Sequence, residues 1–329
     1  MTSFLPVAIH ESRFPGSRGI SARAAFARGR LPGWLLYEGD SQAARWLAYH
    51  AAWSPARTEQ ALRDLYGRAF EAAWAALDSG PRRLVSLGCG GGRKDGDALD
   101  VLPGGAVAHC DYTPVDSSLA LVLQAARHVA GRHALRGCSP LVADLEAEPA
   151  LEAWLAGQEQ AGVRRLFTCF GMIPNLDPDS FPRYVAGLLR PGDGLLLSAN
   201  LSPGGYPADG GRILAQYDNP EARAWYQGAL AGLGLTPDDV ALTVQPRPLT
   251  PEGSRWLIEA VALARRPKRI EVEGATLELA AGSTLRVFHS LRFTLPAILD
   301  LLRDAGLVPA EHWLHAAGEE GIFRCEKRG

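Results

Sequence analysis

A run of glycines is the first feature of the sequence with a chemical meaning. The apolar segment Arg83–Leu87 leads directly into Gly88-Cys89-Gly90-Gly91-Gly92, and a helix is expected after it. Glycines at such a junction let the backbone turn tightly and approach a ligand closely, and the amides of the next helix face an acceptor group. The run lacks the Gly-x-x-x-x-Gly-Lys-Ser/Thr pattern of ATP-hydrolysing loops. Taken alone, it is also compatible with an ordinary turn.

Two carboxylates follow at the ends of the next two expected strands. Asp116 lies 26 positions after Gly90, where a carboxylate can accept hydrogen bonds from both hydroxyls of a ribose. Asp116 could instead cap the following helix. Asp144 ends the third strand, where an acceptor can hold an adenine amino group while Leu145 packs against the ring. Because the carboxyl ends of parallel strands meet at one edge of a sheet, the three signals together predict an adenine-nucleoside site there.

The elements that position these residues alternate between short apolar runs and segments of helical length. The expected strands are 83–87, 106–112, 140–144, 165–170, 195–199 and 321–325, and the expected helices are 40–53, 58–78, 94–102, 117–131, 149–158, 179–189 and 295–305. Such alternation is typical of βαβ units around a parallel sheet. We therefore predict an α/β fold with a Rossmann-like parallel-sheet core.

The alternation stops at the breaker-rich segment Ser202–Pro207, which indicates a second domain. The other expected elements are an irregular arm over 1–33, a partly helical stretch over 218–268, and strands at 269–272 and 275–279. We predict a nucleotide-binding domain formed by residues 61–200 and 285–329, and a smaller substrate-binding domain formed by residues 1–60 and 201–284.

Composition narrows the classes of function. The chain has 329 residues, 47% of them hydrophobic, and a net charge of −2, so it lacks the basic excess that nucleic-acid binding favours. The N-terminus does not resemble a signal peptide, and no apolar stretch reaches bilayer length. Five scattered cysteines and eight unclustered histidines give no disulfide or metal pattern. We expect a cytoplasmic protein that binds neither metal, membrane nor nucleic acid.

At this point the sequence resembles a known family, the histidine-specific Nα-methyltransferases of ergothioneine biosynthesis. The similarity extends from about residue 30 to the C-terminus and includes the part outside the Rossmann-like core. The segments that carry it are Trp34 with Tyr37-Glu38, Pro55–Glu59, Leu87–Lys94, Tyr112–Asp116, Gly171–Asn175, Gln216–Asn219, Ala281–Thr284 and Ser290–Phe293.

The resemblance implies a methyltransferase core that binds S-adenosylmethionine. The residues that would bind this cofactor are Gly88, Gly90, Lys94, Asp116, Asp144 and Leu145. It also implies that Asn175 and Tyr217 hold the carboxylate and amino group of a free amino acid and act as the catalytic residues, with Tyr37 nearby. From the residues themselves, Asn175 could be a turn residue, and Tyr217 could be ordinary packing.

Three positions depart from the family pattern. The family grips the imidazole with a Glu two residues before the matching Ser290, and this chain has Phe288 there. The methionine that the family places against the imidazole falls on Ala260, and a threonine falls on Met172. Ser290 could be an ordinary strand hydroxyl. If the alignment slips by one or two residues, Glu259 could supply the imidazole contact instead.

The expected function is therefore methyl transfer from S-adenosylmethionine to a nitrogen of a small amino-acid-like substrate, histidine-like or aromatic. A related branch of the family methylates indole amino acids, and an apolar pocket suits such a substrate. One alternative is a nucleic-acid amino-methyltransferase, but its Asn/Asp-Pro-Pro-aromatic signature is replaced here by Ile173–Leu176. The other is a protein that binds the cofactor without catalysis.

Overall fold

The computed structural model describes residues 5–103, 105–158 and 162–328. The chain forms two compact units, and each is built from segments that are separate in the sequence. Unit 1 comprises residues 1–10, 59–201 and 295–329, and unit 2 comprises residues 11–58 and 202–294.

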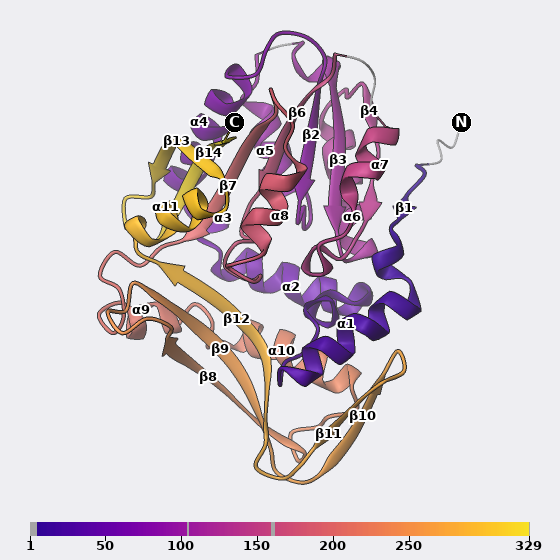
Figure 1. Ribbon diagram of the computed structural model, residues 1–329, viewed down its shortest axis with the longest axis vertical. Helices are drawn as coiled ribbons and strands as arrows, with labels where there is room; N and C mark the ends of the chain where they lie inside the picture. Colours follow the sequence, from indigo (N-terminus) through magenta and orange to yellow (C-terminus); the bar gives the residue numbers. More distant parts are fainter. Residues whose placement is uncertain (1–4, 104, 159–161, 329) are drawn as a thin grey trace. The chain divides into compact units, whose positions relative to one another are not determined.

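Unit 1 is built on a mainly parallel sheet with helices between its strands (Figure 1). The strand order is β1-β5-β3-β2-β6-β7-β14-β13, with β4 beside β3. The strands up to β7 pair in parallel, whereas β14 is antiparallel to both β7 and β13. The strands are Ala8–Ile9 (β1), Arg82–Leu87 (β2), Cys110–Asp116 (β3), Gly137–Cys138 (β4), Leu141–Val142 (β5), Arg164–Cys169 (β6), Gly194–Asn200 (β7), Leu307–Leu314 (β13) and Glu320–Lys327 (β14). The predicted Rossmann-like α/β fold is confirmed.

The central strands are buried along nearly their whole length because helices cover the sheet. Leu84, Val85 and Leu87 of β2 and the run 195–197 of β7 are fully buried. The helices of this unit are Gln60–Ala75 (α4), Arg93–Asp100 (α5), Leu119–Arg132 (α6), Leu151–Gly157 (α7), Phe181–Leu188 (α8) and Leu295–Asp304 (α11), with 3₁₀ turns at Val107–His109 (η3) and Leu145–Ala147 (η4).

A buried carboxyl group joins α5 to the sheet. Tyr112 of β3 donates a hydrogen bond of 2.6 Å from its hydroxyl to Asp95 of α5, and both side chains are buried. Burial raises the pKa of Asp95 to about 6, although the hydrogen bonds from Tyr112 and Ser86 act in the opposite direction. A carboxyl group with this pKa is partly protonated at mildly acidic pH.

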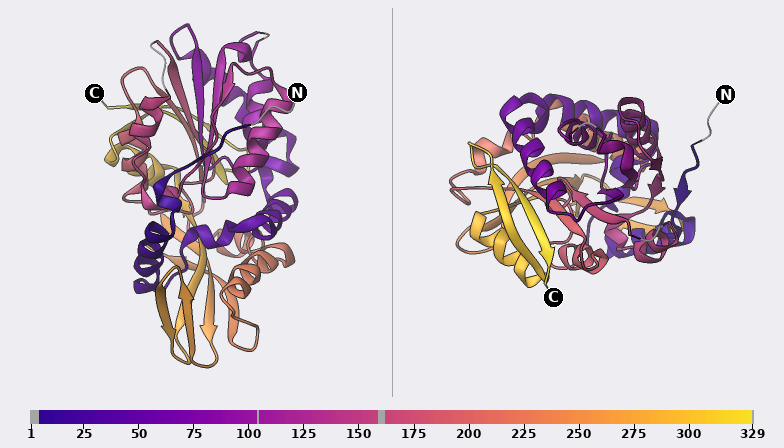
Figure 2. Two further views of the ribbon diagram at one scale, coloured as in Figure 1. Left: turned by 90° about the vertical axis from the view of Figure 1, so that its right-hand side faces the viewer. Right: turned by 90° about the horizontal axis from the view of Figure 1, so that it is seen from above.

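Unit 2 contains a three-stranded antiparallel sheet, a two-stranded hairpin and several helices (Figure 2). The sheet has the order β12-β9-β8, and the hairpin pairs β10 with β11. The strands are Val240–Pro248 (β8), Arg255–Ala264 (β9), Lys268–Val272 (β10), Ala275–Leu279 (β11) and Thr284–Phe293 (β12). The helices are Pro15–Ala27 (α1), Gly39–Trp53 (α2), Pro55–Thr58 (α3), Gly210–Leu214 (α9) and Pro220–Gly232 (α10), with 3₁₀ turns at Glu11–Arg13 (η1) and Gly33–Tyr37 (η2).

Several local expectations were wrong. The expected irregular arm over 1–33 is wrong for its described part, residues 5–33, because they contain β1, which pairs with β5, and the helix α1. The expected strand at 106–112 begins only at Cys110 and continues to Asp116. In the stretch 218–268, α10 is followed by the long strands β8 and β9.

The boundaries of the two units differ from those of the expected domains. Residues 1–10 belong to unit 1, because β1 pairs with β5 in its sheet. Residues 285–294 belong to unit 2, because nearly all of β12 lies there and pairs with β9. None of the helices in the described ranges combines the length and the hydropathy needed to cross a bilayer.

The titration of Asp95 predicts a pH-dependent stability. Because its folded pKa of about 6 exceeds the ordinary 3.8, the folded state binds the proton more tightly than the unfolded state. This group therefore contributes stability at low pH that is lost as the pH rises from about 4 to about 6, by roughly 2–3 kcal/mol in all. Asp95→Asn removes that loss. Compared with the wild type, its free energy of unfolding should decline less between pH 4 and pH 7 in urea titrations.

The matched control is Asp97→Asn, a partly exposed aspartate of the same helix. If Asp95→Asn and the wild type lost stability in parallel over this pH range, the buried carboxyl group would not be the cause.

Candidate active site

The glycine turn connects β2 to α5 at the carboxyl edge of the sheet. Gly88, Gly90 and Gly92 have φ angles of +70°, +51° and +72°, a conformation that side chains rarely adopt. A Cβ at Gly88 would lie 2.1 Å from Sδ of Met172, and a Cβ at Gly92 would lie 2.6 Å from the Ala125 backbone. Both the conformation and the crowding therefore require glycine here.

Asp116 ties this turn to the neighbouring strand. It is the last residue of β3, and its carboxylate accepts hydrogen bonds from the Gly90 amide at 3.1 Å and the Ser118 amide at 3.0 Å. The side chain that caps α6 is Ser118, which accepts from the Leu121 amide at 3.5 Å. Asp116 is therefore a carboxylate at the strand end beside the glycine turn, and another residue supplies the helix cap.

Asp144 and Leu145 lie one strand further along the same edge. They follow β5, whose Val142 is in register with Asp116. Asp144 is buried and accepts a hydrogen bond of 3.1 Å from the Glu146 amide, and Leu145 is buried beside it. The glycine turn and the two carboxylates thus follow three neighbouring strands, in the order that a nucleoside lying across the sheet edge requires.

Lys94 has partners that the sequence did not reveal. It lies in the first turn of α5, and its Nζ donates to the hydroxyl of Tyr66 at 2.8 Å. The same atom is 3.6 Å from a carboxylate oxygen of Glu320 and lies over the Tyr66 ring, 4.2 Å from its centroid. Tyr66 and Glu320 come from α4 and β14, so no local sequence signal could have pointed to them.

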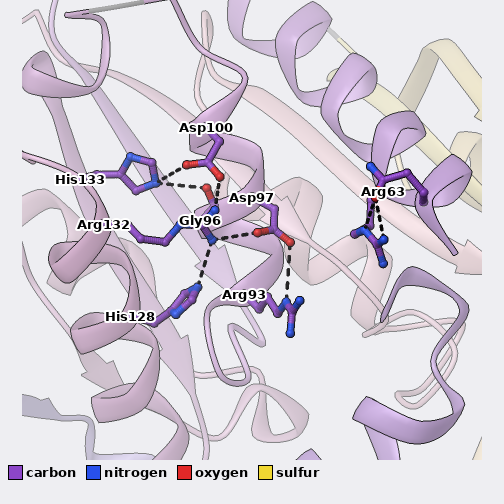
Figure 3. A network of polar contacts seen from close by, with 9 residues as sticks. Arg63, Arg93, Gly96, Asp97, Asp100, His128, Arg132 and His133 are labelled. Atoms are coloured by element: carbon purple, nitrogen blue, oxygen red, sulfur yellow. Dashed lines mark hydrogen bonds and ion pairs between the residues drawn. The ribbon is translucent and has the colours of Figure 1, made fainter. Parts of the chain in front are cut away.

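Helix α5 is held against α6 by a polar network (Figure 3). Arg132 of α6 contacts Asp97 at 2.8 Å and also pairs with Asp100. Nε2 of His133 lies 3.4 Å from Asp100 and 3.1 Å from the carbonyl oxygen of Gly96. Exposed pairs of this kind are individually weak, but several of them together restrain the helix that begins at the glycine turn.

Asn175 lies in the loop that follows β6 in unit 1. Its Nδ2 donates to the carbonyl oxygen of Gly171 at 2.9 Å, and its own amide donates to the Met172 carbonyl at the same distance. These bonds make the loop a compact turn, and Met172 from this turn contacts Gly88. The loop therefore covers the glycine turn and presents the half-buried Asn175 at the same sheet edge.

Tyr217 and Ser290 lie together in unit 2. The hydroxyl groups of the two residues are 2.9 Å apart, and both side chains are buried. Arg292, two residues further along β12, donates to the Tyr217 hydroxyl and to the side chain of Gln216, each at 3.0 Å. The arginine is buried as well, and it was not among the predicted site residues.

Aromatic rings surround these polar groups. Phe288 is 8% exposed and packs against Tyr217, Tyr226 and Trp225, with ring centroids 6.1, 5.5 and 5.3 Å away. Tyr37 packs against Trp225 at 5.5 Å. The structure thus brings Tyr37, Tyr217, Phe288 and Ser290 into one part of unit 2. We call this group the aromatic cluster, and it also includes Tyr226 and Trp225.

The strand register separates Glu259 from this cluster. Phe288 is opposite Ala260 and Ser290 is opposite Ile258, so these four side chains share one face of the sheet. Glu259 is opposite His289 and lies on the other face, where it pairs with Arg247 at 3.3 Å and Gln245 at 3.2 Å. Glu259 therefore does not supply the carboxylate that the family resemblance expects at position 288.

In the part of the chain that the structure describes, no group of three or more His, Cys, Asp or Glu side chains is arranged to hold a metal ion. All five cysteines are free thiols. The chemistry-bearing features are therefore the sheet edge of unit 1 and the aromatic cluster of unit 2.

A parallel α/β sheet with a glycine turn and acidic strand ends defines a nucleoside-binding enzyme of the Rossmann-like class. Residues 19–226 of this chain match the family described as histidine-specific methyltransferase, SAM-dependent. The match spans more than half of the chain, so the protein belongs to this family. Its methyl donor is S-adenosylmethionine.

Solved methyltransferase structures are similar at low sequence identity. An S-adenosylmethionine-dependent methyltransferase from Clostridium acetobutylicum is 11% identical with a TM-score of 0.45, over 86% of this chain and 99% of that one. The 1,6-didemethyltoxoflavin-N1-methyltransferase of Burkholderia thailandensis is 14% identical with a TM-score of 0.41, over 88% and 89%. The glycopeptide N-methyltransferase MtfA is 14% identical with a TM-score of 0.41, over 80% and 87%. No curated protein matches the sequence.

The sheet edge predicts the cost of removing its carboxylate. Asp116→Ala leaves the ribose hydroxyls without a charged acceptor and should weaken binding of S-adenosylhomocysteine by roughly 1–3 kcal/mol in isothermal titration. Because Asp116 also accepts from two backbone amides, Asp116→Asn is the milder variant and should show a smaller loss. Asp300→Ala, an exposed residue of α11, is the control. Wild-type affinity in both Asp116 variants would remove this residue from the site.

Proposed function

We propose that the enzyme methylates a nitrogen of a small amino-acid-like molecule whose side chain is aromatic or apolar rather than an imidazole. The observation that carries this proposal is Phe288, which stands where the family resemblance expects a glutamate. Its ring lies among those of Tyr217, Tyr226 and Trp225.

On the donor side, the sheet edge of unit 1 supplies the binding groups. The backbone of the glycine turn allows close approach of the donor, Asp116 accepts from the ribose, and Asp144 with Leu145 accommodates the adenine. When bound there, S-adenosylmethionine would supply the activated methyl group of its sulfonium to the nitrogen lone pair of the acceptor, and the C–S bonding pair would stay on sulfur. No covalent link to the protein is needed for this reaction.

On the acceptor side, we assign the polar contacts to Tyr217, Ser290 and Asn175. A guanidinium only donates hydrogen bonds, so the Tyr217 oxygen accepts from Arg292 and its own O–H is directed elsewhere, to Ser290 or to the acceptor. Asn175 uses one amide hydrogen to hold its own loop, and its carboxamide oxygen is a suitable acceptor for an amine.

The chain's task in the reaction is orientation more than acid–base catalysis. The attacking amine must be neutral and in line with the methyl group, and water must be kept away from both. Tyr217 and Asn175 can orient an amine through single hydrogen bonds, and the acceptor's ammonium can release its proton to solvent before water is excluded. Precise placement therefore carries most of the rate enhancement in this proposal.

Selectivity follows from the missing carboxylate. A site that hydrogen-bonds a polar ring discriminates strongly for it, whereas an apolar site distinguishes ligands mainly by fit. The hydroxyls of Ser290 and Tyr217 lie beside Phe288 and could bond a ring nitrogen, but neither is charged. Glu259 lies on the opposite face of the sheet. An imidazole would consequently lose the charged partner that favours it in this family, while an indole or phenyl ring would not.

Asn175 provides a test of the assignment to the acceptor. Asn175→Ala should lower kcat about 100-fold, because a misplacement of about 1 Å is enough for such a loss, and should leave S-adenosylhomocysteine affinity nearly unchanged. Turnover would be followed by mass spectrometry and affinity by isothermal titration. Asp179→Ala, an exposed position further along the same loop, is the matched control. Normal turnover with weakened cofactor binding would contradict the assignment.

The substrate itself is tested with labelled S-adenosylmethionine and a panel of free amino acids. We expect kcat/KM for histidine to be roughly 10–100-fold below that for tryptophan or phenylalanine, the range that an apolar pocket can supply. Phe288→Gln, which restores a hydrogen-bonding group, should shift the ratio toward histidine, with thermal unfolding as a check on folding.

Rapid methylation of histidine, together with no methylation of the aromatic amino acids, would contradict the proposed selectivity. Methylation of oligonucleotides in the same assay would favour the nucleic-acid alternative. Tight cofactor binding without turnover of any acceptor would instead indicate a protein that binds the cofactor without catalysis.

A further inference from the structure

Three side chains from separate elements of unit 1 form a charged cluster beside the glycine turn. Lys94 follows the turn in α5, Tyr66 comes from α4, and Glu320 is the first residue of β14. The ammonium of Lys94 lies 2.8 Å from the Tyr66 hydroxyl and 3.6 Å from the Glu320 carboxylate, and Tyr66 donates a hydrogen bond to Glu320.

The cluster lies on the same edge of the sheet as the donor-binding residues. Glu320 is in register with Asn200, the last residue of β7, and Lys94 lies two residues after the glycine turn. Along the strand order β5-β3-β2-β6-β7-β14, Asp144 and Asp116 are on one side of the turn and Glu320 is on the other. A nucleoside held by the two aspartates would therefore direct its 5′ substituent across the turn toward the cluster.

The surroundings make this ion pair more than a surface contact. The side chains of Lys94 and Glu320 are 25% and 13% exposed, and Tyr66 is buried. Lys94 lies over the rings of Tyr66 and Phe170, 4.2 and 5.6 Å from their centroids. The two neighbouring rings and the partial burial of both side chains reduce screening by water, so the two charges keep a strong field at this point.

Tyr66 keeps its proton in this setting. Burial raises the pKa of Tyr66 well above its usual value, and the adjacent Glu320 raises it further. The hydroxyl can therefore accept from Lys94 and donate to Glu320 at the same time, which fixes the separation between the positive and the negative group.

We propose that Lys94, Tyr66 and Glu320 together bind the amino-acid tail of S-adenosylmethionine. Lys94 pairs with the tail's carboxylate, Glu320 pairs with its α-ammonium, and Tyr66 is the positioning residue that holds the two apart. A cation and an anion held at a fixed separation complement a zwitterion, because the ligand's negative group lies against the cation and its positive group lies against the anion. Of these three residues, the family resemblance assigns only Lys94 to the cofactor site. Glu320 and Tyr66 are therefore additional residues of the donor site in this proposal.

The simpler explanation is that the ion pair only fastens α4, α5 and β14 to one another. The two explanations differ in what they predict for a ligand without the tail. 5′-Methylthioadenosine carries the same adenosine and a thioether sulfur but no amino-acid group, so it tests the rest of the site separately.

The experiment compares S-adenosylhomocysteine with 5′-methylthioadenosine by isothermal titration of the full chain. Glu320→Gln removes the charge and keeps the shape, so it should weaken binding of S-adenosylhomocysteine about 10-fold or more, the range for a hydrogen bond to a charged group. Binding of 5′-methylthioadenosine should stay within about twofold. Tyr66→Phe should show the same pattern with a smaller loss. Glu311→Gln is the control, since Glu311 pairs with Arg324 in the same β13–β14 hairpin.

Three results would overturn the inference. They are unchanged affinity for S-adenosylhomocysteine in both variants, an equal loss for both ligands, and a wild type that binds the two ligands equally well. Thermal unfolding shows whether each variant is folded, and Tyr66→Phe carries the test if Glu320→Gln is not. If the wild type bound neither ligand, the proposed function itself would fail, an outcome distinct from loss of tail selectivity alone.

Discussion

The donor side of this enzyme depends on a tight turn whose backbone conformation and close packing together require glycine. Gly88 and Gly92 have positive φ angles, and each is so close to a neighbour, Met172 or the Ala125 backbone, that a Cβ would clash. Asp116 then ties the turn to β3 by accepting from the Gly90 amide. Because the turn, the loop at Met172 and the end of β3 are packed together, a change at one of them would displace the others.

The two units divide the chemistry between different kinds of surface. Unit 1 presents backbone amides and carboxylates at the edge of a sheet, which suits a polar nucleoside and its charged tail. Unit 2 presents rings around a short chain of hydrogen bonds from Arg292 through Tyr217 to Ser290. In the function proposed above, the second surface selects the acceptor, and Phe288 is one of the positions that would set this selectivity.

The parallel core could be predicted because each of its strands is a short apolar run with a breaker or a polar residue at its end. The glycine turn and Asp116 could be predicted because each directly follows or ends such a strand. The helix α1 was not predicted because Pro15 and Gly19 both disfavour a helix interior. Pro15 is nevertheless tolerated because it is the first residue of the helix. Gly19 is needed for packing, since a Cβ there would lie 2.4 Å from the Glu273 carbonyl oxygen.

Other features depend on contacts between distant parts of the chain. The prolines at 246 and 248 argue against a strand, but β8 is at the edge of its sheet, where a missing amide donor is tolerated. The opposite faces of Phe288 and Glu259 required the register of β9 and β12. Tyr66 and Glu320 meet Lys94 only because α4 and β14 pack beside α5, and no spacing in the sequence encodes that.

The pairing of β7 with β14 has a consequence for how the protein is made. These strands are neighbours in one sheet, yet the whole second segment of unit 2 lies between them in the sequence. During synthesis, β7 emerges long before β14, and the β7 edge that pairs with β14 stays unpaired until residues 320–327 have left the ribosome. Contacts between such distant segments slow folding. Unit 1 therefore completes its sheet only after the second segment of unit 2 has been synthesised, and a chain without β13 and β14 would expose the edge of β7 to pairing with other molecules.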